Sequence, residues 1–212
     1  MKLLPQNRHA KLRFVCLLLV LISVAVYYRF DRVALYYFSD KAEGDIVFQS
    51  LPRGDLVDAI ETITDSPWSH CGVLLRQDGR WMVAEAIGEV RVTPLHLWIM
   101  RGRNSRIDAY RVNNFPSSDL PALQAEIDKL MGRPYDYRYA PEDAEIYCSE
   151  LVYKAYDRAC GLRLGVWEKL GDLNWKPAEA FIRKVENGNL PLERPMISPV
   201  GLTRDEKVER VY

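Results

Sequence analysis

Hydrophobic and polar positions divide the chain into an apolar N-terminal run and a long mixed segment. In the run, residues 14–28, the one polar side chain is Ser23. Basic residues flank it on both sides: Lys2, Arg8, Lys11, Arg13 and Arg29. The run is shorter than the roughly 20 residues that span a bilayer, but the flanking arginines can extend their charges to the interface. The pattern therefore predicts a membrane-targeting segment over residues 1–30.

The pattern leaves two fates open for this segment. Tyr27 and Tyr28 suit the interfacial aromatic belt of an anchored helix. The small residues of "SVA", 23–25, suit signal-peptide cleavage, although a polar region before the cut is missing. In both cases the positive flank should stay in the cytoplasm. We therefore expect the rest of the chain on the extracytoplasmic side, held at the inner membrane as a single-pass protein or released into the periplasm.

After a connector over residues 31–43, the pattern becomes that of a folded domain, residues 44–212. The connector either continues the first helix as a stalk or packs on the domain. The apolar residues 46–48 indicate a buried strand. A helix follows, indicated by apolar residues at helical spacing: Leu56, Ile60 and Ile63.

The clearest β-pattern is a predicted hairpin. Asp78-Gly79 supplies the two positive-φ positions that a tight type I′ turn needs. Strands over about 70–77 and 80–87 should therefore pair across it. In that register His70 and Glu85 are diagonal neighbours on one face, about 7–8 Å apart at the backbone. Both faces of the hairpin carry apolar residues, so we expect other elements to cover both.

Composition indicates one ordinary globular domain and argues against nucleic acid as a partner. The chain is 48% hydrophobic and 27% charged. Lys plus Arg and Asp plus Glu both total 29, so there is no net positive charge to attract a polyanion. The number of subunits is left open.

Cys148 stands where an amphipathic helix is predicted to begin. The apolar stripe that follows it consists of Leu151, Val152, Ala155, Tyr156 and Ala159, and Gly161 is a natural terminator. In the first turn, unpaired N–H groups and the helix dipole favour a thiolate over a thiol. By position alone, a buried cysteine without chemistry is the simpler interpretation.

Sequence motifs around Cys148 and earlier in the chain indicate a chemical role for this cysteine. "GRPYDYRYAPEDAEIYCSELVYKAY", residues 132–156, resembles the nucleophile region of the NlpC-like cell-wall hydrolases, where Gly-x-Pro-Tyr leads into a Cys-Ser pair opening a helix. In that family's usual order the histidine follows the cysteine, whereas His70 and His96 precede Cys148 here. This order resembles the circularly permuted, YiiX-type branch of the papain-like fold. Three short motifs carry the likeness: "SHCG" at 69–72, "AEA" at 84–86 and "YCSEL" at 147–151.

The resemblance implies an α+β, circularly permuted papain-like fold, with the cysteine helix packed against an antiparallel sheet. It implies Cys148 as nucleophile, His70 as general base and later acid, and Glu85 as the group that orients His70. Tyr135, which matches the tyrosine of Gly-x-Pro-Tyr, is expected to line the site. A thiolate of this kind attacks a carbonyl and passes through an acyl-enzyme.

Substrate class follows less directly from the resemblance. Many NlpC-like peptidases have Asp directly before the nucleophile, where it helps to read the peptide. Tyr147 takes that position here and is expected to contact the substrate. We expect a cysteine hydrolase of amide bonds in cell-envelope peptides. The alternatives are a lipid or lipoprotein acyl hydrolase or acyltransferase with the same three residues, and a non-catalytic envelope-binding module that retains the fold.

The other candidate side chains receive structural interpretations. Cys71 is expected to face away from His70 into the core and Cys160 to be buried near the helix end, which keeps Cys148 a free thiol. His96 lies in an apolar segment and is interpreted as structural. Two further acidic residues near the motifs compete for the orienting role: Glu89 and Glu150. Without a Cys-x-x-Cys or His-x-x-x-His pair, neither a metal nor another cofactor is predicted.

Overall fold

The computed structural model describes residues 8–38, 40–140 and 142–212, without the side chains of residues 28, 30–35 and 38. Lys2 of the predicted positive flank and the side chain of Tyr28 therefore lie outside the described residues. The chain divides into two units, Met1–Ser39 and Asp40–Tyr212.

The first unit contains one long helix, α1 (Arg8–Phe38). Its stretch Arg8–Tyr27 is long and apolar enough to cross a membrane, and a signal sequence would have the same properties. The helix continues to Phe38. Residues 31–38 of the connector are thus helical, and the choice between a stalk and packing on the domain stays a prediction.

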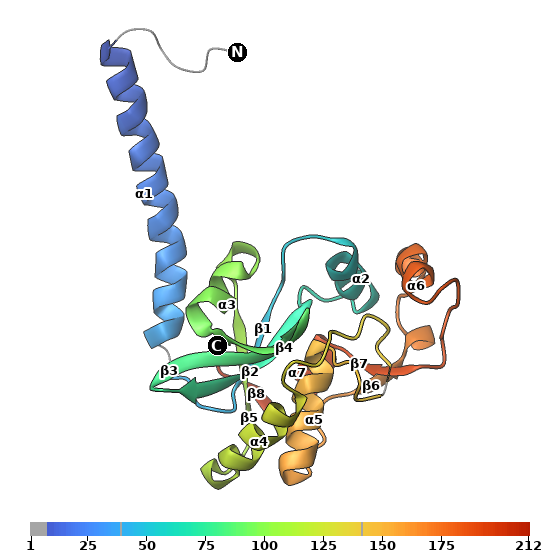
Figure 1. Cartoon of the computed structure of the whole chain (residues 1–212). Coiled ribbons are helices and arrows are strands. Elements are labelled where there is room, and N and C mark those ends of the chain that lie inside the picture. Colours follow the sequence, from blue (N-terminus) through green and yellow to red (C-terminus); the bar gives the residue numbers. More distant parts are fainter. Residues whose placement is uncertain (1–7, 39, 141) are drawn as a thin grey trace. The chain divides into compact units, whose positions relative to one another are not determined.

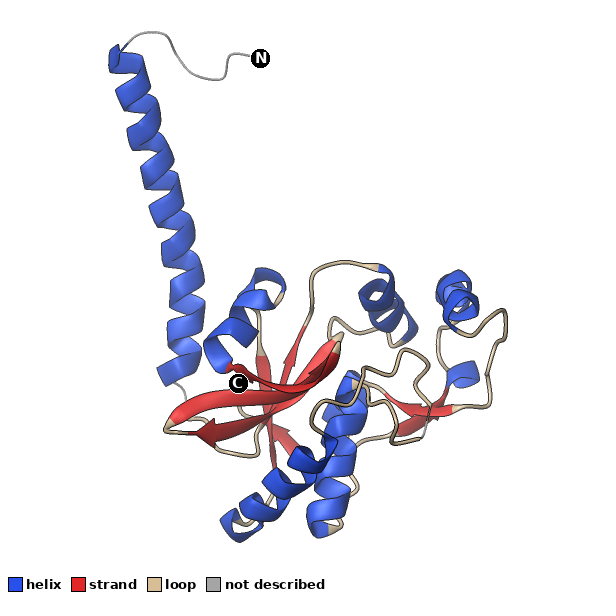
Figure 2. Cartoon of the chain, viewed as in Figure 1, coloured by secondary structure: helices blue, strands red, loops and turns tan. Residues whose placement is uncertain are grey.

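The second unit combines a six-stranded antiparallel sheet with helices (Figures 1 and 2). Its strands are β1 (Ile46–Gln49), β2 (His70–Gln77), β3 (Arg80–Ile87), β4 (Glu89–Pro94), β5 (Asp108–Val112), β6 (Trp167–Lys169), β7 (Pro195–Ile197) and β8 (Val208–Arg210). Its α-helices are α2 (Asp55–Ile63), α3 (Leu95–Arg101), α4 (Leu120–Leu130), α5 (Cys148–Cys160), α6 (Glu179–Val185) and α7 (Pro199–Thr203). Short 3-10 helices are η1 (Arg103–Ser105), η2 (Ser117–Asp119), η3 (Leu170–Asp172) and η4 (Lys176–Ala178). The large sheet has the order β4-β3-β2-β1-β5-β8, and β6 pairs with β7.

The predicted hairpin is confirmed, including its register. β2 and β3 pair antiparallel with Gln77 opposite Arg80. Asp78 and Gly79 both adopt positive φ, 49° and 74°, as the tight turn requires. Because side chains alternate between faces along each strand, this register decides which residues of the two strands can meet.

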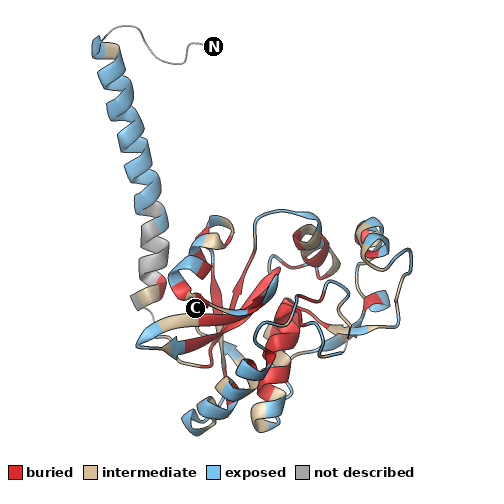
Figure 3. Ribbon diagram, viewed as in Figure 1, coloured by how far each residue is buried: buried red, intermediate tan, exposed pale blue. Residues whose placement is uncertain are grey.

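Both faces of the hairpin are covered, as expected. On one face Val73, Leu75 and Ala84 belong to the main core, together with residues of α4 and α5 such as Leu123 and Leu151. On the other face Leu74 and Val83 are fully buried, and α3 packs against β3 and β4. Figure 3 shows how completely the central strands and the start of α5 are buried. Removing this apolar surface from water stabilises the sheet and fixes the position of α5 on it.

Candidate active site

His70 and Glu85 come together as the hairpin register predicts. His70 is the first residue of β2 and is 1% exposed, and Glu85 on β3 is fully buried. His70 Nε2 lies 2.6 Å from Glu85 Oε2. This bond assigns Nε2 to the carboxylate and leaves Nδ1 as the ring nitrogen for another partner.

That partner is Cys148, the first residue of α5. The helix begins at Cys148, as predicted, and ends before Gly161, whose φ is 73°. Cys148 hydrogen-bonds to His70 and is fully buried. The structure therefore brings the three predicted residues into one chain of contacts, in which the imidazole lies between carboxylate and thiol.

The pKa shifts of Cys148, His70 and Glu85 favour the charged form of each group. Burial disfavours the imidazolium, but hydrogen bonds and charges of Cys148 and Glu85 outweigh it and raise the pKa of His70 to about 9. Burial also disfavours the carboxylate, but His70 and then Arg101 lower the pKa of Glu85 to about 2. A thiolate, an imidazolium and a carboxylate are thus the expected states at neutral pH.

Cys71 is buried in the core, as predicted, but the expectation that burial separates it from Cys148 is wrong. A hydrogen bond from the Cys71 thiol is the largest cause that lowers the pKa of Cys148, ahead of His70, and the backbone N–H of Cys71 adds to it. The reason is that α5 packs on the sheet face that carries Cys71. All three remain reduced: Cys71, Cys148 and Cys160 are free thiols.

Cys160 is less buried than predicted, and the interpretation of His96 as structural stays a prediction. Cys160 is half-buried rather than buried, because it lies in the last turn of α5, where its thiol donates to the carbonyl of Tyr156 at 3.3 Å. His96 is exposed on α3, while its neighbours Leu95 and Trp98 are fully buried. Neither residue belongs to the contacts around Cys148.

Of the acidic candidates, only Glu85 reaches His70. Glu89 is exposed at the start of β4. Glu150 is fully buried, but it accepts from the backbone N–H of Tyr147 at 3.3 Å and pairs with Lys154 at 2.5 Å. It therefore serves the start of α5 rather than the imidazole.

Tyrosine side chains lie beside the thiol. Tyr135 is buried, and its hydroxyl is 3.1 Å from that of Tyr139. Burial raises the pKa of both phenols, and the charge of Cys148 raises both further, so both hydroxyls stay protonated near it. The ring of Tyr147 packs against that of Tyr139 with 4.3 Å between centroids. The Tyr147 hydroxyl accepts from Ile197 N at 3.2 Å, and the side chain is 1% exposed. In this structure Tyr147 thus supports Tyr139, and its contact with substrate stays a prediction.

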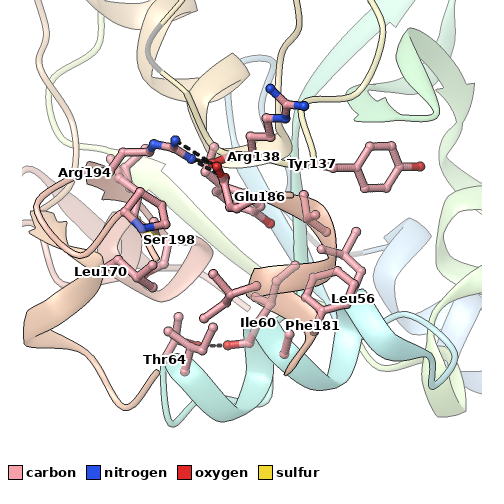
Figure 4. Close-up of a pocket in the computed structure, with 18 of the residues that line it drawn as sticks. Leu56, Ile60, Thr64, Tyr137, Arg138, Leu170, Phe181, Glu186, Arg194 and Ser198 are labelled. Atoms are coloured by element: carbon pink, nitrogen blue, oxygen red, sulfur yellow. Dashed lines mark hydrogen bonds and ion pairs between the residues drawn. The ribbon is translucent and has the colours of Figure 1, made fainter. Parts of the chain in front are cut away.

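Two cavities adjoin at this site. The smaller is lined by His70 and Tyr135, among other residues. The larger lies between α2, α6 and the start of α7 (Figure 4). They share three lining residues: Leu56, Ile60 and Tyr137. The polar side chains of the larger cavity are mostly engaged with the protein itself, for example Thr64 with the carbonyl of Ile60 and Arg194 with Glu186.

Two residues that contact Glu85 were not anticipated from the sequence. Thr93 Oγ1 donates to Glu85 Oε1 at 2.5 Å, and Arg101 donates to Oε2. Thr93 had a weak signal, because residues 90–93 alternate apolar and polar, which places Thr93 on the same face of β4 as Arg91, the partner of Glu85. Arg101 had none, since only the packing of α3 places it there.

Comparison with known proteins gives consistent matches. A family model described as permuted papain-like amidase enzyme, YaeF/YiiX, C92 family, matches residues 40–212. The uncharacterized protein YiiX of Escherichia coli K12 is 35% identical over 159 residues, which are 74% of this chain and 78% of that protein. The crystal structure of YiiX from Escherichia coli O157:H7, described as a metalloprotein, superposes with a TM-score of 0.76 at 32% identity. That match covers 80% of this chain and 96% of the other.

Proposed function

Since the chain belongs to the permuted papain-like amidase family of cysteine hydrolases, we propose that it hydrolyses amide bonds in cell-envelope peptides, with Cys148, His70 and Glu85 as its catalytic residues. The observation that carries the proposal is the position of His70, which bonds to Glu85 on one side and to Cys148 on the other. A buried structural cysteine would need neither partner.

The geometry supports a definite sequence of steps. The Cys148 thiolate attacks the carbonyl carbon, and the resulting oxyanion is met by the backbone N–H of Cys148, which has no helical acceptor at this position. The His70 imidazolium gives its proton to the leaving amine as the C–N bond breaks, which leaves an acyl-thioester. His70 then takes a proton from water, whose oxygen attacks the thioester and releases the acid. Glu85 stabilises the imidazolium throughout.

The N-terminal helix supports an extracytoplasmic site of action. Arg8, Lys11 and Arg13 precede or begin the apolar stretch. Positive flanks of this kind stay in the cytoplasm, so the domain from Asp40 onward would face the periplasm, where envelope peptides are found. A retained anchor and a cleaved signal peptide both fit this orientation.

One observation favours a second candidate, an acyl hydrolase or acyltransferase that acts on lipids or lipoproteins with the same three residues. The larger cavity adjoins the smaller one, which His70 lines, through Leu56, Ile60 and Tyr137. Its lining is mainly apolar, and its engaged polar groups leave few hydrogen bonds for a peptide main chain. Val185→Trp, which fills this cavity, should lower the rate on long-chain relative to short-chain acyl esters. Val208→Trp on β8 is the matched control at another half-buried valine.

A resident metal would be a further element of the site, since the YiiX crystal structure is described as that of a metalloprotein. In the described part of this chain, no group of three or more His, Cys, Asp or Glu side chains is arranged to hold a metal ion. The described residues therefore do not fit a resident metal, and the proposed mechanism uses none.

A substrate panel tests the proposal. Envelope peptides, lipopeptides and acyl esters would be incubated with the wild type, with Cys148→Ala and with Cys160→Ala. We expect release of a free amine from at least one peptide by the wild type and by Cys160→Ala, with loss of at least about 1,000-fold in Cys148→Ala. Full activity in Cys148→Ala would exclude the assigned nucleophile. Turnover of esters alone would favour the second candidate.

A further inference from the structure

The Glu85 carboxylate is held by more than His70. Its Oε2 accepts from His70 Nε2 at 2.6 Å and from Arg101 Nη2, while its Oε1 accepts from Thr93 Oγ1 at 2.5 Å. Arg91 Nε lies farther away, 3.7 Å from Oε1. Both carboxylate oxygens are thus bonded, in a position with no exposure to solvent.

A single short helix, α3, supports both members of the His70–Glu85 pair. Trp98 and Arg101 are three positions apart and so lie on one face of the helix. The Trp98 ring lies 6.1 Å from the His70 ring, centroid to centroid. Arg101 ends the helix, with its side chain 23% exposed, and reaches Glu85 from there. The packing of α3 on β3 and β4 therefore places the Trp98 ring near the imidazole of His70 and the Arg101 guanidinium beside the Glu85 carboxylate.

A buried carboxylate at this position needs such support. Without compensation, desolvation would favour its protonated form, which cannot accept a second strong bond from the imidazole. The charged groups that face Glu85 are His70 from β2, Arg91 from β4 and Arg101 from α3. Of the two arginines, Arg101 makes the direct bond, and charge-assisted bonds of this type are stronger and more directional than neutral ones.

We propose that Arg101 and Thr93 are positioning residues of this site, which keep Glu85 ionised and in the one orientation that directs His70 toward Cys148. The assignment rests on the proposed function. Arg101 supplies the charge, and Thr93 fixes the plane of the carboxylate by binding the oxygen that His70 does not use. Neither residue contacts the thiol, so each acts through Glu85.

The test compares Arg101→Gln and Thr93→Val with Arg106→Gln, a matched control at an exposed arginine that pairs with Asp108 instead. The readout is the rate of Cys148 alkylation by iodoacetamide between about pH 5 and about pH 8, with peptide mass spectrometry, which needs no substrate. Removal of the Arg101 charge raises the pKa of Glu85. The fall of the Cys148 alkylation rate at acid pH should therefore begin at a higher pH. We expect near-constant rates in the wild type and Arg106→Gln, about a 10-fold loss toward pH 5 in Arg101→Gln, and a smaller loss in Thr93→Val.

Unchanged pH profiles in folded Arg101→Gln and Thr93→Val, as judged by circular dichroism, would overturn the proposal. If Arg101→Gln does not fold, Thr93→Val carries the test, because it removes a bond to the same carboxylate with little change in shape. A different failure is recognisable in the wild type. Should its Cys148 react no faster than Cys160 across the range, the proposed function itself would fall, and this assignment with it.

Discussion

The thiol and the backbone N–H of Cys71 both lower the pKa of the Cys148 thiol. Because His70 directly precedes Cys71 at the start of β2, one strand end provides both the imidazole and two further donors for the thiolate. The helix start alone would lower the pKa of Cys148 only in part. The adjacent residues 70 and 71 therefore act on the nucleophile together, although they belong to opposite faces of the strand.

Cys71→Ala should weaken the thiolate, because it removes the largest cause that lowers the pKa of Cys148. We expect about a 10-fold slower reaction of Cys148 with iodoacetamide at about pH 6. Cys71→Ser keeps an O–H donor and should retain most of the reactivity. Equal rates in the alanine and serine variants, both at the wild-type level, would show that Cys71 is only a core residue.

Glu85→Gln should slow acylation of the enzyme by about 100- to 10,000-fold with the fold intact, because an amide cannot stabilise the imidazolium and favours the wrong tautomer. Stopped-flow acylation with an activated ester measures the effect. Glu89→Gln, at an exposed position on β4, is the matched control and should behave as the wild type. If Glu85→Gln acylates at the control rate, another group orients His70.

Stability should fall at acid pH through Glu85. Its pKa in the folded protein, about 2, lies below the ordinary value of 4.5. Its contribution to stability is therefore fully present above about pH 4.5 and is lost as the pH falls toward 2. Between about pH 6 and about pH 3, urea unfolding should show the wild type losing about 2 kcal/mol more than Glu85→Gln. Parallel losses in the two proteins would mean that Glu85 is not ionised in the folded state.

Topology is tested by reporter fusions after residue 212. The positive flank before the apolar stretch predicts an extracytoplasmic C-terminus. Alkaline phosphatase fused there should be active and β-galactosidase inactive. The mass of the protein recovered from the envelope would then distinguish a retained helix from a cleaved signal peptide. An active β-galactosidase fusion would reverse the assigned orientation.

Local signals were enough to predict the elements that carry the site. Asp78-Gly79 fixes the turn, and through the period of two it fixes which face His70 and Glu85 share. The apolar stripe after Cys148 and the glycine at 161 likewise mark both ends of α5. Each of these inferences depends on residues close in sequence.

Contacts that depend on packing between distant elements could not be predicted in the same way. The contact of Cys71 with Cys148 arises because α5 lies on one particular face of the sheet. Arg101 reaches Glu85 because α3 packs on β3 and β4. No periodicity within α3 or β2 carries that information. The larger cavity has the same origin, since its lining comes from α2, α6 and the segment around Ile197.

Trapping the acyl group on Cys148 tests the catalytic assignment at its chemical step. The wild type would be mixed with a p-nitrophenyl ester at neutral pH, quenched in acid, digested and mapped by mass spectrometry, with Cys148→Ala and His70→Asn in parallel. We predict one acyl-thioester, on the peptide that contains Cys148, absent from Cys148→Ala and formed at least about 100-fold more slowly in His70→Asn. Acylation spread equally over Cys71, Cys148 and Cys160, or unaffected by the loss of His70, would contradict the assignment.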